Sequence, residues 1–414
     1  MTKILLANVD KPDQASIGKY RERGGYKALE KALAMEQTAL IEEVKASGLR
    51  GRGGAGFPTG MKWSFVPRNT NKPTYLLCNA DESEPGTFKD RLLMECDPHL
   101  LIEGMAIACY ALDCHLSYIY IRGEYEFVAN KQQKALDEAY EAKILGPSLF
   151  GKDYALDIFI HLGQGAYICG EETSLIESLE GNRGYPRIKP PFPATHGFLA
   201  SPTVVNNVET LAALPWIIQN GGAAYAAIGT EKSKGTKLIS VSGHVAKPGV
   251  YEVDLGYPLL DFINNEAGGI ANGRKLKAVI PGGSSVPVMT AAECEGALLD
   301  YESLLKAGSM LGSGGMIVLD DTTSMPETLS VIADFYAHES CGQCTPCREG
   351  TGWAAKILKN LVAGQGHRSD VDLLLKIADR MEGKTICPLA DADVMPIRSF
   401  VTKFRSEFEA LCAS

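Results

Sequence analysis

The spacing of apolar residues changes twice along this chain. Up to about residue 230, helical patterns alternate with short apolar strands, of which Tyr75–Cys78, Tyr118–Ile121 and Asp157–Ile160 are examples. Such alternation is typical of an α/β layered domain. The most apolar stretch, Leu100 to Ile121, contains charged residues. It therefore predicts a core helix leading into a strand, not a membrane span.

The first change of pattern follows a linker-like polar run at Glu231–Gly235. Beyond it, strand patterns dominate and one helix candidate interrupts them, which indicates a small α+β module. The strands are expected at Lys237–Ser242, Gly249–Val253, Ala278–Ile280 and Met316–Leu319, and the helix at Pro258–Glu266.

The second change comes at Pro326, where apolar residues begin to recur at helical spacing. Segments 326–340, 351–364, 370–383 and 396–412 each show this spacing, so four packed helices are expected. The pattern as a whole predicts domains at 1–230, 231–322 and 323–414.

Composition narrows the class of protein. The chain has 414 residues, with 45% hydrophobic and 22% charged side chains, which is ordinary for a folded protein. Its net charge of −9 argues against nucleic acid as a partner, because phosphate backbones are bound by clustered Lys and Arg. The first residues, MTKILLANVD, lack the pattern of a secretory signal. Most of the 11 cysteines are scattered singly among apolar neighbours, so a reducing compartment is expected.

Three cysteines form the exception. Cys341, Cys344 and Cys347 follow one another at intervals of three residues, and a distant thiol would complete a four-cysteine cluster site. Cys387 is the expected fourth ligand, with Cys412 as a competitor. Zinc is the alternative, but structural zinc sites usually use two short ligand pairs, and here only His338 is added to a triplet and a single cysteine.

Three loops of the first domain are candidates for ligand binding. The glycine-rich run Gly51–Gly60 suits close approach to an anion, although a mobile surface loop is an almost equal reading of glycine content alone. The acidic run Asn79–Thr87 follows a strand, where α/β folds place ligand contacts. The run Gly163–Thr173 opens a helix expected at Glu172–Leu179, whose amino terminus would favour a phosphate.

A fourth segment, Pro202–Thr210, supplies amide side chains at Asn206 and Asn207, which serve equally well as helix caps. Each of these signals is weak by itself. Together with the cysteine set, they indicate a redox enzyme that binds a flavin or a dinucleotide.

Five sequence motifs of this chain together resemble those of a known family. The strings GRGGAGFPTG with Lys62 and Trp63, NADESEPGTFKDR, GAYICGEET, VVNNVET and ESCGQCTPCREG occur in this order over nearly the whole chain. This combination resembles the NADH-binding flavoprotein subunit of proton-pumping NADH:quinone oxidoreductase, respiratory complex I. The resemblance implies a Rossmann-like flavin domain, a ubiquitin-like β-grasp domain and a carboxyl-terminal four-helix bundle.

The resemblance also implies FMN, a [4Fe–4S] cluster and NADH as substrate. The implied FMN contacts are Gly51, Arg52, Gly53, Lys62, Asn79, Asp81, Gly170, Glu171, Asn206, Asn207 and Thr210. The implied NADH contacts are Gly54, Phe57, Phe65, Glu84, Glu172, Lys189 and Phe192. The same loops add Ala55, Gly56, Glu82, Ser83, Tyr167 and Val205 to the cofactor-binding set, and Glu84 and Tyr167 are expected at the reacting centre. The implied cluster ligands are Cys341, Cys344, Cys347 and Cys387.

Two departures from the family pattern affect these expectations. Gln164 stands where a small residue is usual, and Pro388 follows the fourth cysteine. We expect them to alter local loop packing and the cluster's geometry or potential, but not ligation itself.

By resemblance, the partners are the thioredoxin-like [2Fe–2S] subunit and the large iron–sulfur subunit. The location is the cytoplasmic face of a bacterial inner membrane, or the matrix side in mitochondria. The alternatives are the diaphorase subunit of an NAD-reducing hydrogenase or NAD-dependent formate dehydrogenase, and a scaffold that holds a cluster without turnover.

Overall fold

A four-stranded parallel sheet with the order β3-β2-β1-β4 forms the centre of the first unit. The computed structural model describes residues 2–68 and 70–412. The strands are β1 (Tyr75–Ala80), β2 (Leu116–Ile121), β3 (Asp157–Leu162) and β4 (Thr203–Asn207). The expected α/β layering is confirmed, and β4 is added to the strands that the pattern indicated.

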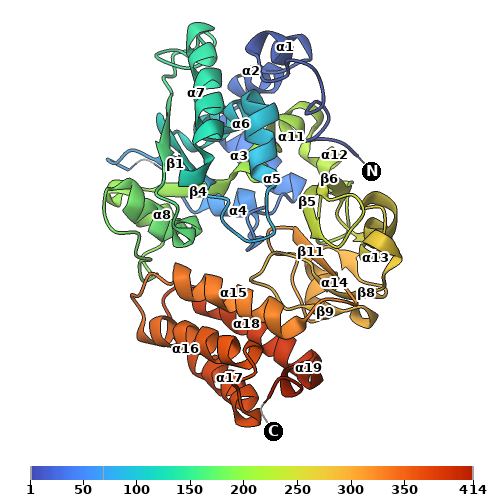
Figure 1. Cartoon of the computed structure of the whole chain (residues 1–414). Helices are drawn as coiled ribbons and strands as arrows, with labels where there is room; N and C mark the ends of the chain where they lie inside the picture. Colours follow the sequence, from blue (N-terminus) through green and yellow to red (C-terminus); the bar gives the residue numbers. More distant parts are fainter. Residues whose placement is uncertain (1, 69, 413–414) are drawn as a thin grey trace.

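Helices cover this sheet and fill the space behind it (Figure 1). Nearly every residue of the central helix α6 is buried, as expected of a helix that is apolar all round. The helices of the unit are α1 (Ile17–Glu22), α2 (Lys27–Leu33), α3 (Gln37–Ser47), α4 (Thr59–Ser64), α5 (Lys89–Cys96), α6 (Pro98–Leu112), α7 (Glu126–Glu141), α8 (Glu172–Leu179), α9 (Pro193–His196), α10 (Val208–Ala212), α11 (Leu214–Asn220) and α12 (Gly222–Ala226).

The strand order reverses direction at β1. From β1 the chain passes through α5 and α6 to β2 and then through α7 to β3, whereas β4 pairs with the other side of β1. In open α/β sheets, ligands bind at the carboxyl ends of strands where the order reverses. The loops after β1 and β4 lie at this point, which places the acidic run beside Asn207.

The second unit contains a five-stranded mixed sheet with the order β6-β5-β11-β8-β9. Only β5 and β11 pair in parallel, and the other neighbours are antiparallel. Its elements are β5 (Thr236–Gly243), β6 (Gly249–Asp254), β7 (Tyr257–Pro258), α13 (Leu259–Asp261), β8 (Leu276–Ile280), β9 (Met289–Thr290), β10 (Leu298–Leu299), α14 (Tyr301–Lys306) and β11 (Gly315–Asp320).

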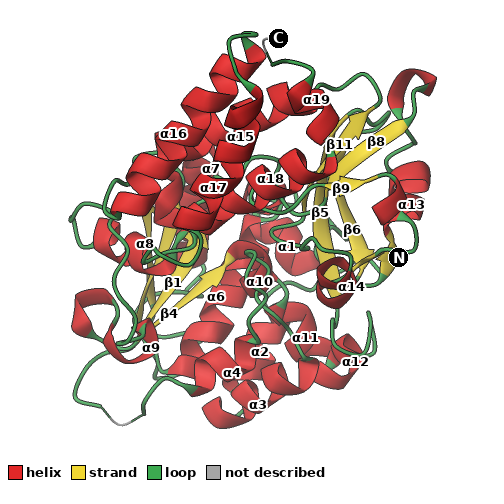
Figure 2. Ribbon diagram, turned by 90° about the horizontal axis from the view of Figure 1, so that it is seen from below, coloured by secondary structure: helices red, strands yellow, loops and turns green. Residues whose placement is uncertain are grey.

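The third unit is helical. Its four long helices pack in the order α15, α16, α17, α18, and α18 packs back on α15, so that they form a closed ring. Figure 2 shows these helices lying across the edge of the parallel sheet and next to the mixed sheet. The helices are α15 (Met325–Glu339), α16 (Thr345–Val362), α17 (Arg368–Met381), α18 (Leu389–Lys403) and α19 (Arg405–Glu409).

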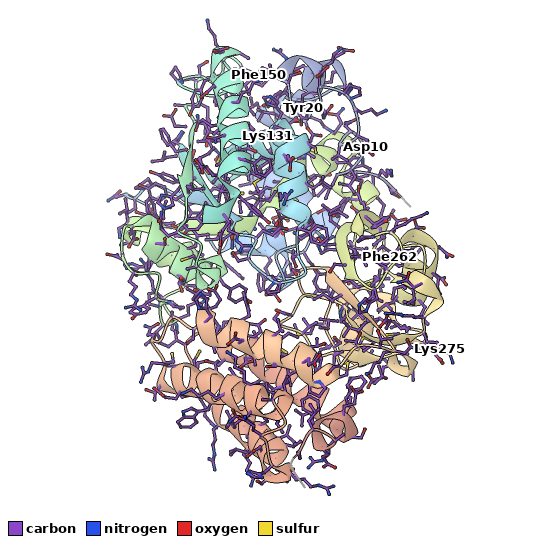
Figure 3. All side chains as sticks on the ribbon, in the orientation of Figure 1. Asp10, Tyr20, Lys131, Phe150, Phe262 and Lys275 are labelled. Atoms are coloured by element: carbon purple, nitrogen blue, oxygen red, sulfur yellow. The ribbon has the colours of Figure 1, made fainter. Side chains whose placement is uncertain are left out.

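Three apolar clusters hold these units together. Tyr20 belongs to the cluster of the first unit and Phe262 to that of the second; Figure 3 labels both residues among the side chains of their units. The other cluster runs from Leu77 and Val205 on the parallel sheet, through Ile280 of β8, to the four helices. The parallel sheet, the turn at residues 167–170 and the helical unit therefore share one packed interior.

Several expectations about helices need correction. The fourth helical segment is two helices, since α18 ends at Lys403 and α19 begins at Arg405, and Cys412 lies beyond both. Helix α18 also begins before Pro396, which lies inside it. Burial of Ile397 and Phe400 continues the apolar face past this proline, which compensates for the lost N–H donor.

The helix candidate in the second unit is also altered. It consists of the short α13 followed by one wider turn at Phe262–Glu266. Within the described residues, no helix is long and apolar enough to cross a membrane.

Candidate functional site

The glycine loop before α4 is a closed turn. The N–H of Gly51 donates to the carbonyl of Phe57 over 2.8 Å, and Tyr301 of the second unit donates to the carbonyl of Gly51 over 3.0 Å. Gly54 and Gly56 have φ values of +139° and +64°, which side chains other than hydrogen rarely tolerate. A Cβ at Gly56 would also lie 2.6 Å from the ring of Tyr301. The loop is therefore fixed in shape and is not a mobile surface loop.

Arg52 fixes this loop from inside the protein. Its backbone N–H donates to Thr210 over 2.9 Å, and its guanidinium donates to the carbonyl of Lys234 over 2.6 Å and to Tyr225 over 3.2 Å. Burial alone would lower the pKa of Arg52, but the neighbouring tyrosines and Glu209 raise it above its ordinary value. The guanidinium and the backbone N–H of Arg52 thus both have partners inside the protein, and the expected ligand contact of Arg52 stays a prediction.

The glycine loop and the end of β4 approach each other closely. A Cβ at Gly53 would lie 3.1 Å from the Cβ of Asn207. Asn207 caps α10 by accepting a hydrogen bond from the N–H of Glu209 over 3.0 Å, so the capping interpretation holds for it. Asn206 instead accepts a hydrogen bond from the indole of Trp63 over 2.8 Å. The two amides therefore connect β4 to the glycine-loop side of the site.

The loop after β1 contains an unsatisfied acid. Asp81 Oδ1 accepts from Ser83 over 3.0 Å, while Oδ2 is buried and has no partner among the described residues. Burial raises the pKa of Asp81 to about 7. A Cβ at Gly170 would lie 3.4 Å from Oδ2, and Asn79 donates to the carbonyl of Gly170 over 2.8 Å. The buried oxygen is free to accept a hydrogen bond from a bound molecule.

Glu82, unlike Asp81 and Glu84, binds backbone N–H groups at the start of a helix. Its carboxylate accepts hydrogen bonds from the backbone N–H groups of Asp90 and Arg91 over 2.8 and 3.0 Å, at the start of α5. Burial raises the pKa of Glu82 to about 7. In this structure Glu82 therefore stabilises a helix start, and its expected ligand contact stays a prediction.

Glu84 lies at the junction of the first and second units. Tyr167 donates to its Oε2 over 2.7 Å, and the N–H of Ser285 donates to its Oε1 over 2.8 Å. Burial raises the pKa of Glu84, against the effect of these donors. The two residues expected at the reacting centre are therefore in direct contact.

Two lysines and two glutamates form the opposite side of the site. Lys62 lies 2.8 Å from Glu172 and donates to the carbonyl of Val205 over 2.9 Å. Lys189 lies 2.9 Å from Glu171 and 3.2 Å from Glu172. Burial would raise the pKa of Glu172, but both lysines outweigh it and lower the pKa. Glu172 is therefore ionised.

Glu171 also changes the expectation for α8. Its carboxylate accepts hydrogen bonds from the N–H groups of Thr173 and Ser174 over 2.8 and 3.0 Å, so these donors are already used. The amino terminus of α8 is correspondingly less open to a phosphate than the glycine run suggested.

Three phenylalanines flank these loops with free faces. Phe57, Phe65 and Phe192 are 46%, 54% and 57% exposed, and the first two rings lie 6.1 Å apart. Exposed flat apolar rings next to charged loops are suited to stacking on a planar base. Ala55, at the tip of the glycine loop, is exposed as well.

The four candidate cysteines meet at one end of the helical unit. Cys341 and Cys344 precede α16, whereas Cys347 lies in its first turn, so the triplet is not confined to a loop. Cys387 follows α17, and its neighbour Ile386 donates its N–H to Cys344 Sγ over 3.4 Å. Ser340 Oγ lies 3.2 Å from Cys347 Sγ. The distant thiol is thus brought back to the triplet.

Cys412, the competitor for the fourth position, lies elsewhere. Cys412 is near Asp370 in the first turn of α17, whereas Cys387 follows the last turn. A helix of 14 residues separates these ends by about 20 Å. His338 is exposed on α15. Cys387 is therefore the residue that the fold places beside the triplet.

The donor set suits a cluster better than a single ion. Among the described residues, no three His, Cys, Asp or Glu side chains converge tightly enough to hold one metal ion. A cubane cluster distributes its four thiolates over separate irons, so its ligands stand farther apart than ligands of one zinc ion. All 11 cysteines are free thiols, as ligation requires.

Four residues of the second and third units also reach the site, although no sequence motif indicated them: Ser284, Ser285, Tyr301 and Tyr336. The turn-rich string PGGSSVP at residues 281–287 is the one signal that could have pointed to the serines.

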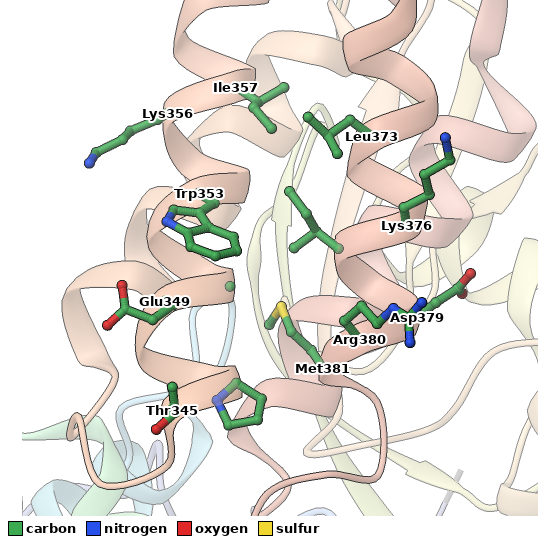
Figure 4. Close-up of a pocket in the computed structure, with 13 residues that line it drawn as sticks. Thr345, Glu349, Trp353, Lys356, Ile357, Leu373, Lys376, Asp379, Arg380 and Met381 are labelled. Carbon is green, nitrogen blue, oxygen red and sulfur yellow. The ribbon is translucent and has the colours of Figure 1, made fainter.

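A hollow of about 1020 Å³ lies apart from these loops, between α16 and α17. Figure 4 shows Trp353, Ile357 and Leu373 facing it. None of the expected site residues lines this hollow.

Comparison with known proteins places the chain among redox subunits. Residues 44–216 match the Nuo51 FMN-binding domain, residues 237–318 an SLBB domain, and residues 327–411 the NADH-ubiquinone oxidoreductase-F iron-sulfur binding region. The second F-type subunit of the NADH-quinone oxidoreductase of Rhizobium meliloti (strain 1021) is 52% identical over 98% of this chain and 97% of its own. The F-type subunit of the Rickettsia bellii (strain OSU 85-389) enzyme is 51% identical over 90% of this chain and 89% of its own.

A solved structure is also similar. A chain of an NAD⁺-reducing [NiFe]-hydrogenase in the H2-reduced state superposes with a TM-score of 0.86 at 38% identity. The match covers 94% of the present chain but only 65% of the hydrogenase chain.

Proposed function

Because the chain belongs to the family of F-type subunits of NADH-quinone oxidoreductase, we propose that it is the electron-input subunit of a respiratory complex I. It oxidises NADH and feeds quinone reduction through other subunits. One observation carries this proposal: the candidate binding loops at the carboxyl ends of the parallel strands are in direct contact with the four-cysteine end of the helical unit. Tyr167 of the loops and Glu339 next to the cysteines are joined by a hydrogen bond of 3.0 Å.

The site fits FMN on two grounds. The glycine cradle leaves room that a Cβ would fill, and Asp81 Oδ2 is a buried acceptor without a partner among the described residues. Ribityl hydroxyls and flavin N–H groups are donors that such an acceptor needs. The residues proposed to hold FMN are Gly51, Arg52, Gly53, Lys62, Asn79, Asp81, Gly170, Glu171, Asn206, Asn207 and Thr210.

NADH is proposed to bind beside it, among Gly54, Phe57, Phe65, Glu84, Glu172, Lys189 and Phe192. When bound, FMN supplies hydride acceptance from NADH, and a [4Fe–4S] cluster on Cys341, Cys344, Cys347 and Cys387 supplies one-electron transfer. The protein's own contribution is orientation. The phenylalanines offer stacking faces, the fixed loops set the approach, and no side chain needs to move a proton in this step.

The finer architecture belongs to the same proposal. We assign residues 1–230 to a Rossmann-like flavin domain, 231–322 to a ubiquitin-like β-grasp domain and 323–414 to a four-helix bundle. The parallel sheet with its switch point, the match to an SLBB domain and the closed ring of α15–α18 support these assignments.

As part of complex I, the protein works with other subunits of that complex. The proposed direct partners are the thioredoxin-like [2Fe–2S] subunit and the large iron–sulfur subunit. The proposed location is peripheral, on the cytoplasmic face of a bacterial inner membrane or the matrix side in mitochondria. Affinity purification of the tagged chain from its host, followed by identification of the associated subunits, tests both assignments.

The same purification distinguishes the proposed function from the second candidate. The similarity to a hydrogenase chain favours, as second candidate, a diaphorase subunit of an NAD-reducing hydrogenase or NAD-dependent formate dehydrogenase. Hydrogenase or formate dehydrogenase subunits in the eluate would establish that alternative, and quinone-reductase subunits would exclude it. A scaffold without turnover would show no NADH-dependent ferricyanide reduction.

A further inference from the structure

The Glu84 carboxyl is held by groups from two different units. From the first unit, Tyr167 donates to Oε2 over 2.7 Å. From the second unit, the N–H of Ser285 donates to Oε1 over 2.8 Å, and the hydroxyl of Ser284 lies 3.4 Å from the same oxygen. Both carboxyl oxygens are thus engaged, and the side chain has one defined orientation.

The turn that carries these serines, residues 282–285, is shaped to reach Glu84. Gly283 has a φ of +102°, and a Cβ there would lie 2.6 Å from Glu84 Cγ. The N–H of Ser284 donates to the carbonyl of Pro85 over 3.1 Å, which fixes the turn against the acidic loop. Only a glycine at position 283 permits this approach.

A hydrogen-bonded path continues from this turn toward the cysteines. The hydroxyls of Ser284 and Tyr336 lie 2.9 Å apart, and both residues are buried. The carbonyl of Tyr336 accepts from the N–H of Ser340 over 3.0 Å, and Ser340 Oγ lies 3.2 Å from Cys347 Sγ. Because Tyr336 is in the last turn of α15, it connects Glu84 to the segment that enters the cysteine triplet.

We propose that Ser284 and Tyr336 are positioning residues for NADH binding, acting through Glu84 although neither belongs to the flavin-binding unit. This inference rests on the proposed function, in which Glu84 contacts NADH. The alternative is that both hydroxyls only satisfy each other in the interior. Buried hydroxyl pairs do occur for that reason alone, so the test must separate positioning from packing.

The test uses the full chain loaded with flavin and cluster, and NADH:ferricyanide activity at several NADH concentrations. Ser284→Ala and Tyr336→Phe each remove one hydroxyl from the path. Loss of a hydrogen bond that orients a binding group corresponds to about a three- to tenfold weaker interaction. We therefore expect KM for NADH to rise by about this factor in each variant, with kcat and flavin content nearly unchanged.

Coupling to Glu84 provides the decisive comparison. In a Glu84→Gln background, Tyr336→Phe should add little to KM, because the group it positions is already altered. Full additivity of the two changes would overturn the proposal, and so would unchanged KM in both single variants. Ser284→Thr, which keeps the hydroxyl, should restore KM toward that of the natural protein.

Matched controls exclude a general effect of removing a tyrosine hydroxyl. Tyr257 in the second unit donates to Glu266 over 3.2 Å, away from the site, so Tyr257→Phe should leave KM unaltered. An equal KM increase in this control contradicts the proposal. If Tyr336→Phe does not fold, Ser284→Ala gives the same comparison from the other side of the path.

Hydrogen exchange tests the link between Ser284 and α15 without enzyme turnover. Hydrogen exchange of the loaded protein should become faster in residues 336–344 of Ser284→Ala, and unchanged protection there would contradict the link to α15. Failure of the natural protein to reduce ferricyanide with NADH would instead refute the proposed function itself.

Discussion

The ammonium group of Lys62 lies 2.8 Å from the carboxylate of Glu172, and this ion pair joins the helix after the glycine loop to the start of α8. Glu172 is half-buried, and Lys62 and Lys189 keep it ionised. A negative charge held at this point accepts hydrogen bonds from ribose hydroxyls and repels a 2′-phosphate.

The first prediction concerns this charge and the choice of cofactor. The natural protein should prefer NADH strongly over NADPH, and Glu172→Gln should narrow the ratio of their kcat/KM values by about tenfold or more. Steady-state kinetics with both cofactors measures the ratio. An unchanged ratio would remove Glu172 from this role.

The second prediction concerns the fourth cluster ligand. Cys387→Ser should abolish or greatly alter the EPR signal of the reduced cluster while flavin binding survives, because the thiol is at the cysteine end of the helical unit and the flavin loops are not. Cys412→Ser is the matched control and should retain the signal, since Cys412 lies near the opposite end of α17. A full signal in Cys387→Ser would refute the assignment.

The third prediction tests the shape of the glycine loop. Gly56→Ala requires a side chain at φ +64° and places a Cβ 2.6 Å from the Tyr301 ring. We expect a loss of about 1–3 kcal/mol in the free energy of unfolding and a marked loss of bound flavin. Gly18→Ala on α1 has open space around its Cβ, so it should not lower the free energy of unfolding and should leave bound flavin unchanged. Urea unfolding measures the free energy of unfolding. Flavin fluorescence of the protein, after its separation from unbound flavin, measures the bound flavin.

The fourth prediction concerns pH and Asp81 in flavin-free protein. Its folded-state pKa is raised to about 7 by burial, above the value of the unfolded chain. Between these two values the folded state binds more protons than the unfolded state, so this group's contribution to stability falls as pH rises to about 7 and levels off above it.

Asp81→Asn should therefore reduce the loss of stability between about pH 5 and pH 8 by about 2 kcal/mol. Urea unfolding at both pH values, in the natural protein and in the variant, gives the comparison. Other buried acids, such as Glu82 and Asp97, titrate in the same direction and remain in both proteins, so they cancel. Parallel pH profiles would show that Asp81 is already ionised in the folded state.

Much of the architecture was predictable because periodicity reports local burial. The named strands of the parallel sheet and the four amphipathic helical segments appear close to their expected positions. The start of α18 could not be predicted from Pro396, because tertiary burial of Ile397 and Phe400 overrides the helix-breaking tendency of proline. The short strands β7, β9 and β10 span two residues each and are too short for a periodic signal.

Site residues could be predicted from the sequence where a motif lies on one loop. Contacts between different units could not be predicted in this way. Asp81, Glu84 and Glu172 were identified from strings, but the burial of the Arg52 guanidinium depends on Tyr225 and Lys234, which are distant in sequence. The contact of Glu84 with Ser285 spans 201 residues, and no local pattern encodes it. Helix capping by Glu82 and Glu171 likewise required the three-dimensional positions of the N–H groups.

The most direct test of the whole account is an anaerobic NADH titration of the purified chain, followed by absorbance and EPR spectroscopy. The account predicts a flavin absorbance band that NADH bleaches and NADPH does not, together with the EPR signal of a reduced [4Fe–4S] cluster. A protein that contains neither flavin nor iron, even after anaerobic reconstitution with both, would contradict it.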